Sequence, residues 1–399
     1  ATWLLLTSLL VLPAAIVAAA ERPGKAAIAS AHFMATEAGH EILAQGGNAF
    51  DAAIAVAAAL AVVEPTSSGI GGGGFWLLHR AEDGFQVMVD SREKAPAAAH
   101  RDMYLDEDGA VNRDLAINGP LAGGIPGEVA GFEHIARQYG RLPLSVSLQP
   151  AIRIARDGFE VDEKFARLMG WRVDQIRRWP AAAEAFLIDG EAPPVGHVIR
   201  LPDLAWVLEQ IAERGAAGFY SGPVAEKLLA GVREAGGIWT QDDLAAYEVV
   251  EREPIRTMYG GLELVTASPP SSGGIALAEI LNVLEPYPLD ELDPVLRTHL
   301  TVEAMRRAAV LSLLIALPLS VGVVSFLLSL GLSSSTLFAA EGLKRVVEQE
   351  NVEKAAAVVE AINAENSRKR YRIENLKVRL AQVSPASRRM PTVKAIKTI

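Results

Sequence analysis

Arg92 is the residue whose type and position most directly suggest binding chemistry. It follows the apolar run VMV and an Asp-Ser pair, precedes Glu93, and comes shortly after a glycine-rich loop at residues 69–74 (GIGGGG). An arginine held in a fixed position binds a carboxylate through paired hydrogen bonds, which lysine cannot form. Residues 45–96 therefore predict a rigid cradle for a small carboxylate-bearing substrate. The commoner alternative, on these residues alone, is a surface arginine paired with Glu93.

Two further motifs offer chemistry of another kind. The glycines at 69–74 match GxGxxG as text, but a dinucleotide site needs a strand, the glycines and a helix in that order. Here a helical pattern comes before the glycines and a strand pattern after them, which excludes a nucleotide site. Residues 271–274 (SSGG) offer hydroxyls and free amides before a helix. They fit an anion-binding turn or a tight turn with a serine cap, and the second is the commoner structure.

Composition excludes several other classes of site. The sequence has no cysteine, so disulfides, thiolate zinc sites and a cysteine nucleophile are excluded. Its seven histidines show no metal-ligand spacing, and no GxSxG elbow is present. The net charge of −10 argues against a nucleic-acid partner. We therefore expect no cofactor and no metal, and the motifs by themselves name no nucleophile.

Helices and strands in alternation must position these residues. Small and apolar residues at helical spacing predict helices at 33–44 and 51–63, the second capped by Asn48 or Asp51. Strand patterns at 75–79 and 86–89 flank the turn 81–84. Together they predict a β-hairpin that leads to Arg92. The remaining expected elements are helices at 127–139, 148–156, 203–212, 223–235 and 275–284, a helix start at Thr240 and a strand at 262–266.

The two ends of the sequence differ in character from residues 21–307. Residues 1–20 carry an apolar run and a small-residue site typical of a secretory signal, although a buried N-terminal helix is the alternative. Residues 308–332 hold no charge and are long enough for a transmembrane helix, with a buried core helix as the alternative. We expect residues 333–399 to form a basic, partly helical tail. Because basic segments beside a span stay in the cytoplasm, residues 21–307 are expected on the exported side, anchored to the membrane.

Seven motifs in order carry a resemblance to a known family. They are ATEAGHEILAQGGNAFDAAIA, VEPTSSGIGGGGF, DSREKAP, GPLAGGIPGEVAGFE, LQPAIRIARDGF, TQDDLAAYE and PPSSGG. Residues 24–308 resemble the large-subunit half of the γ-glutamyltranspeptidases. The resemblance implies an α/β fold, the αββα sandwich of the N-terminal-nucleophile hydrolases. It also implies a precursor that cleaves itself into a large and a small subunit.

The resemblance implies a reaction and assigns a role to Arg92. The N-terminal threonine of the small subunit attacks the γ-glutamyl amide of glutathione or a related donor, with its own α-amino group as base. Water, an amino acid or a peptide then resolves the glutamyl enzyme. Arg92 corresponds to the arginine that holds the α-carboxylate of the donor. The resemblance therefore favours a binding role for Arg92 over a surface arginine paired with Glu93.

The sequence departs from the family pattern after the seventh motif. A TTHxS-like processing motif is absent, and so are the nucleophilic threonine, the small subunit's carboxylate- and amine-binding residues and its oxyanion-hole glycine pair. We therefore expect no catalytic residue in this chain, an incomplete sandwich, and no activity without a small subunit supplied in trans.

Two alternatives to the enzyme fragment stay open. One is a membrane-anchored, non-catalytic protein that binds γ-glutamyl compounds through Arg92. The other is an acylase of the same superfamily that acts on a different amide, which Arg92 disfavours because it suits a donor with an α-carboxylate.

Overall fold

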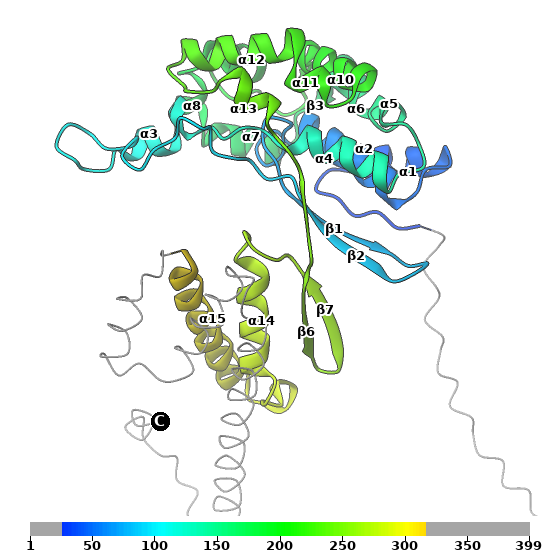
Figure 1. The fold of residues 1–399 in the computed structure, drawn as a ribbon, viewed down its shortest axis with the longest axis vertical. Coiled ribbons are helices and arrows are strands. Elements are labelled where there is room, and N and C mark those ends of the chain that lie inside the picture. Colours follow the sequence, from blue (N-terminus) through cyan, green and yellow to red (C-terminus); the bar gives the residue numbers. More distant parts are fainter. Residues whose placement is uncertain (1–25, 317–399) are drawn as a thin grey trace, which may run out of the picture. The chain divides into compact units, whose positions relative to one another are not determined.

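The computed structural model describes residues 26–316, and these form two compact units (Figure 1). The first unit contains residues 26–74 and 90–250, and the second contains residues 75–89 and 251–316. Each is described by itself. The predicted signal at 1–20, the tail at 333–399 and most of the predicted span at 308–332 lie outside the described residues.

The first unit is mainly helical. Its elements are α1 (Phe33–Ala44), α2 (Ala49–Val63), α3 (Arg113–Ile117), η1 (Pro120–Ala122), α4 (Glu128–Gln138), α5 (Leu144–Ser147), α6 (Gln149–Asp157), β3 (Phe159–Glu160), α7 (Glu163–Gly170), α8 (Val173–Ile176), α9 (Pro180–Phe186), β4 (Val198–Ile199), α10 (Pro202–Arg214), α11 (Ala217–Tyr220), α12 (Gly222–Glu234) and α13 (Gln241–Ala245). Strands β3 and β4 pair antiparallel, with Phe159 opposite Ile199.

Helix α2 forms the core of this unit. It packs against α1, α4, α5 and α6, and α1, α2 and α4 lie side by side in Figure 1. Ile54, Ala55 and Val62 are completely buried. The alanines of α2 allow neighbouring helices to approach closely, and α1 presents Gly39 to it, where a Cβ would lie 2.7 Å from the side chain of Val56.

The start of α2 is fixed by a buried carboxylate. Asn48 caps the helix and Asp51 completes a capping box, so both residues named as possible caps take part. Asp51 is fully buried and also accepts hydrogen bonds from the backbone amides of Arg141 and Leu142, at 3.0 and 3.3 Å. A Cβ at Gly140 would lie 2.5 Å from its carboxylate, so glycine there leaves room for this contact. Asp51 thus ties α2 to the segment after α4.

The larger sheet belongs to the second unit, apart from its end residues Asp90 and Val250. Strands β1 (Phe75–Arg80), β2 (Phe85–Asp90) and β5 (Val250–Arg252) form a three-stranded sheet in the order β1-β2-β5. Strands β6 (Ile255–Tyr259) and β7 (Leu262–Thr266) pair antiparallel through the turn Gly260-Gly261, where both φ angles are positive. Helices α14 (Gly273–Leu284) and α15 (Pro294–Ala316) pack together, with the short helix η2 (Leu289–Glu291) between them in sequence.

The structure confirms a mixed fold of helices and strands in the described residues. The helix predicted at 33–44 and the strand predicted at 262–266 have the predicted bounds, and Gly46, with φ of +93°, follows α1. The four-layer αββα arrangement stays a prediction, because the sheets of the described residues have three, two and two strands.

The membrane span stays a prediction as well. Within residues 26–316, no helix combines the length and the apolar character needed to cross a membrane. The boundary expected between residues 307 and 308 falls inside α15, which begins at Pro294 and includes charged residues such as Arg297 and Glu303.

Replacing Asp51 with alanine should destabilise the first unit strongly. The variant leaves the amides of Asn48, Arg141 and Leu142 without their acceptor, so we expect the free energy of unfolding to fall by about 2–4 kcal/mol. Urea denaturation followed by circular dichroism measures the change. Asp162→Ala is the matched control, since it removes an exposed helix cap that accepts from Phe165 and should cost only about 1 kcal/mol. Equal losses for the two variants would contradict this account.

Candidate functional site

Arg92 lies directly beyond β2, and its backbone is held on both sides. Its amide donates to the Asp90 carboxylate at 3.1 Å, and its carbonyl oxygen accepts from the Tyr247 hydroxyl at 2.8 Å. The residue itself is exposed. The prediction that a strand leads to Arg92 is therefore confirmed, while its rigidity and its role as a carboxylate ligand stay predictions.

The glycine loop approaches Arg92 at one glycine in particular. A Cβ at Gly73 would lie 2.1 Å from the carbonyl oxygen of Ser91 and 3.0 Å from the Cα of Arg92. Next to it, Gly74 and Ser91 exchange two backbone hydrogen bonds of 3.0 and 3.3 Å. Gly69 and Gly71, in contrast, have open space where a side chain would be. The loop thus requires glycine where the backbone passes Arg92.

The order of elements around the loop is helix α2, glycines and strand β1. The predicted order of helix, glycines and strand is therefore confirmed, and it differs from the strand, glycines and helix that the dinucleotide motif requires.

The start of α4 connects the glycine loop to the Arg92 segment. The carbonyl oxygen of Gly72 accepts from the amides of Gly127 and Glu128, at 2.8 and 3.1 Å. Lys94 and Ile125 exchange two backbone hydrogen bonds of 2.7 and 3.2 Å. Three segments far apart in sequence, at residues 72–74, 91–94 and 125–128, are therefore held together; we call them the cradle.

Two carboxyl groups belong to the cradle. Burial raises the pKa of Glu128 to about 7, and the negative charge of Glu93 contributes to the rise. Glu93 lies against the glycine loop, because a Cβ at Gly72 would be 3.0 Å from its Oε1 atom. Arg92 and these carboxyl groups are of the types that pair with the carboxylate and the ammonium group of an α-amino acid.

Two stacked tyrosines support the cradle. The ring centroids of Tyr220 and Tyr247 lie 5.8 Å apart, and their planes are 2° from parallel. The Tyr220 hydroxyl donates to the carbonyl of Pro126 at 2.8 Å, and the ammonium group of Lys94 lies 4.9 Å from the centre of the Tyr247 ring.

Glu128, Tyr220 and Tyr247 were not identified as site residues from the sequence. Tyr247 is 155 residues from Arg92, and no local pattern predicts such a contact. The available signal was the motif set itself, because GIPGEVAGFE contains Glu128 and TQDDLAAYE contains Tyr247.

Residues 271–274 form a tight turn at the start of α14, in the second unit. The Ser271 hydroxyl accepts from the amide of Gly273 at 3.3 Å, and a Cβ at Gly274 would lie 2.0 Å from the carbonyl of Ala267. These contacts fit the tight-turn alternative, although Ser272, the residue at the N-cap of α14, makes no side-chain cap.

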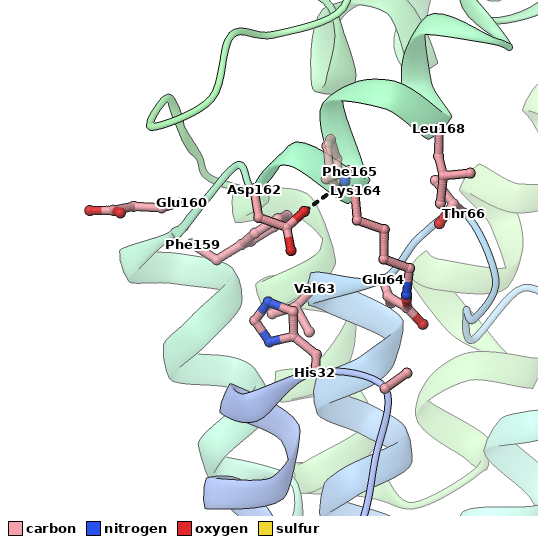
Figure 2. A pocket seen from close by; sticks show the side chains of 11 residues that line it. His32, Val63, Glu64, Thr66, Phe159, Glu160, Asp162, Lys164, Phe165 and Leu168 are labelled. Carbon is pink, nitrogen blue, oxygen red and sulfur yellow. Dashed lines mark hydrogen bonds and ion pairs between the residues drawn. The ribbon is translucent and has the colours of Figure 1, made fainter.

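A small hollow in the first unit gathers a second set of polar side chains (Figure 2). His32 caps α1 by accepting from the amide of Met34 at 3.2 Å, and burial lowers its pKa, against the opposing effect of Asp162 and Glu64. Glu64 is buried and ion-paired with Lys164, and Asp162 caps α7. These groups join α1, α2 and α7, and the described part of the chain contains no group of three or more acidic or histidine side chains able to hold a metal ion.

Replacing Glu128 with glutamine should change the dependence of stability on pH. The folded carboxyl has a raised pKa of about 7, so the stability it confers is fully present below the unfolded value of 4.5 and is lost as pH rises through 7. We expect Glu128→Gln to unfold like the wild type at pH 4 and to be more stable at pH 8, by at most about 3 kcal/mol. Thermal unfolding at both values measures this, with the exposed Glu226→Gln as control. An equal effect at both pH values would count against a buried, proton-binding Glu128.

Comparison with known proteins identifies the family. The sequence model described as Gamma-glutamyltranspeptidase matches residues 35–319. The glutathione hydrolase proenzyme of Pseudomonas sp. (strain A14) is 41% identical over 286 residues, which is 71% of this chain and 50% of that protein. The proenzyme of Escherichia coli (strain K12) is 42% identical over 261 residues, 65% of this chain and 45% of that protein. The chain thus spans about half the length of these curated relatives.

Solved structures agree with the sequence comparison. The γ-glutamyltranspeptidase of Helicobacter pylori superimposes with a TM-score of 0.68 at 40% identity, covering 70% of this chain and 81% of that one. The enzyme of Pseudomonas nitroreducens, solved with L-DON, gives 0.65 at 39% identity, covering 71% and 84%. The mixed α/β fold is that of these enzymes, and the resemblance inferred from the seven motifs is confirmed. The chain belongs to the γ-glutamyltranspeptidase family.

Proposed function

We propose that this chain supplies the donor-binding half of a γ-glutamyltransferase, or glutathione hydrolase. The observation that carries the proposal is the cradle, in which the backbone of Arg92 is fixed by Asp90, Tyr247 and the close approach of Gly73. Arg92 binds the α-carboxylate of glutathione or another γ-glutamyl donor through paired hydrogen bonds. That contact fixes the distance from the anchored end of the donor to its scissile amide, and such positioning lowers the barrier.

The reacting threonine comes from a small subunit that acts in trans. Residues 1–399 carry no processing motif; on this proposal they bind the donor, and the small subunit supplies the nucleophile and the oxyanion hole. With such a partner, the strands of both subunits complete the αββα sandwich. The names of the relatives, glutathione hydrolase proenzymes, support this substrate class.

Binding by an Arg92 variant tests the substrate class. We expect the full chain in detergent micelles to bind L-glutamate and glutathione, and Arg92→Ala to weaken both by about 10–100-fold, the value of a charge-assisted bidentate pair. The affinity of Arg92→Lys should lie between those of the wild type and Arg92→Ala, because lysine keeps the positive charge but cannot form paired hydrogen bonds. Isothermal titration calorimetry measures the affinities, with Arg101→Ala as an exposed control. Equal binding by the wild type and Arg92→Ala would disprove the role of Arg92.

Turnover tests the need for a small subunit. The purified chain should release neither glutamate nor 4-nitroaniline from γ-glutamyl substrates, because it contributes no activated nucleophile. A small subunit added in trans should restore release. Turnover by the chain alone would refute the proposal that the nucleophile comes from a separate small subunit. It would not contradict donor binding by Arg92.

We propose in addition that residues 1–20 act as an export signal, that residues 308–332 span the membrane, and that the basic tail at 333–399 stays in the cytoplasm. The uncharged run and the basic tail support this arrangement. They also favour a second candidate function, a membrane-anchored protein that binds γ-glutamyl compounds without catalysis. Protease treatment of intact cells should remove residues 21–307 and spare the tail. Recovery of the whole chain in the soluble cytoplasmic fraction would rule out the anchored arrangement.

A further inference from the structure

The hydroxyl group of Tyr247 contacts the Arg92 backbone from a distant part of the sequence. It donates to the carbonyl oxygen of Arg92 at 2.8 Å across 155 residues of sequence. Burial, together with the charges of Asp90, Glu93 and Glu128, raises the pKa of Tyr247 well above its usual range. The phenol therefore stays protonated, and its hydroxyl stays a donor at physiological pH.

The ring that carries this hydroxyl is held on two sides. Tyr220 stacks on it, and Tyr220 is fixed in turn by its own hydrogen bond to Pro126. The ammonium group of Lys94 lies over the same ring and donates to the carbonyl of Glu248 at 2.7 Å. Tyr247 thus has little freedom to move away from Arg92.

The space for the hydroxyl is provided by glycine. A Cβ at Gly127 would lie 2.0 Å from the Tyr247 oxygen and 2.1 Å from the carbonyl oxygen of Ser91. The same glycine donates its amide to Gly72. Gly127, the glycine loop and the Arg92 segment therefore meet at the hydroxyl of Tyr247.

We propose that Tyr247 is a positioning residue for donor recognition: its hydroxyl fixes the backbone of Arg92 and so sets the affinity of the cradle for an α-carboxylate. The inference rests on the proposed function, in which Arg92 binds the donor, and adds a residue that touches no substrate. Without this hydrogen bond, Arg92 samples more orientations before binding, and the ligand has to order the segment itself.

Tyr247→Phe tests the inference because it removes one oxygen and keeps the stacked ring. We expect calorimetry on the full chain in detergent micelles to show about 10-fold weaker binding of L-glutamate. Binding of 4-aminobutyrate, which lacks the α-carboxylate, should not change. In the double variant with Arg92→Ala, Tyr247→Phe should have no further effect, because the group that it positions is gone. Tyr104→Phe is the matched control: it removes a similar hydroxyl-to-carbonyl bond, to Leu121.

The outcomes separate this inference from the function on which it rests. If Arg92→Ala weakens glutamate binding and Tyr247→Phe does not, the positioning role is wrong and the proposed function stands. The positioning role is also wrong if Tyr247→Phe weakens binding equally in the presence and absence of the Arg92 side chain.

If glutamate binding does not depend on Arg92, the proposed function fails. Hydrogen–deuterium exchange then tests whether Tyr247 fixes the backbone of Arg92. In Tyr247→Phe, peptides that cover residues 91–95 should exchange several-fold faster than in the wild type and in Tyr104→Phe. Unchanged exchange of these peptides would overturn the inference.

Discussion

The close approach of the Gly73 backbone to Ser91 and Arg92 is the constraint on which the candidate site depends. At 2.1 Å from an oxygen atom, no side chain can exist at position 73 without moving one of the two segments. The approach lets Gly74 and Ser91 pair through their backbones and leaves the carbonyl of Gly72 for the start of α4. A single missing side chain thus allows three segments to converge beside one arginine.

The electrostatics of the cradle follow from the same convergence. The amides that begin α4 donate to the carbonyl of Gly72, so the partly buried side chain of Glu128 lies beside the glycine loop, close enough for Glu93 to affect its pKa. Burial first, and then the negative charge of Glu93, make the Glu128 carboxyl keep its proton more readily. An ammonium group brought by a ligand would offset that charge, which is consistent with a donor that carries both charges of an amino acid.

Local sequence signals predicted the elements of the fold where those signals are strong. Asn48 with Asp51 and Thr240 with Asp243 form the capping boxes that their spacing suggests, and the glycines after α1 end it. Strands β3 and β4, with two residues each, are too short to show a periodic pattern, and pairing between Phe159 and Ile199 depends on contacts 40 residues apart. The beginning of helix α15 at Pro294 was not predicted, because charged residues such as Arg297 and Glu303 separate it in character from the uncharged run that starts at residue 308.

The candidate site could be predicted only in part, for a related reason. Arg92 and the glycines are neighbours in sequence, whereas the environment of Glu128 and the hydrogen bond from Tyr247 arise when distant segments pack. The family motifs include both residues, but a motif does not say which atom touches which.

The construction of the cradle also bears on how a divided enzyme would work. Every contact that fixes the backbone of Arg92 described above comes from within the first unit, from Asp90, Ser91, Gly74 and Tyr247. These backbone contacts involve no partner subunit, so the free-energy cost of ordering the Arg92 backbone does not add to the cost of subunit association. On the function proposed here, donor recognition by this half would precede assembly, and the nucleophile would meet a substrate whose carboxylate is already anchored.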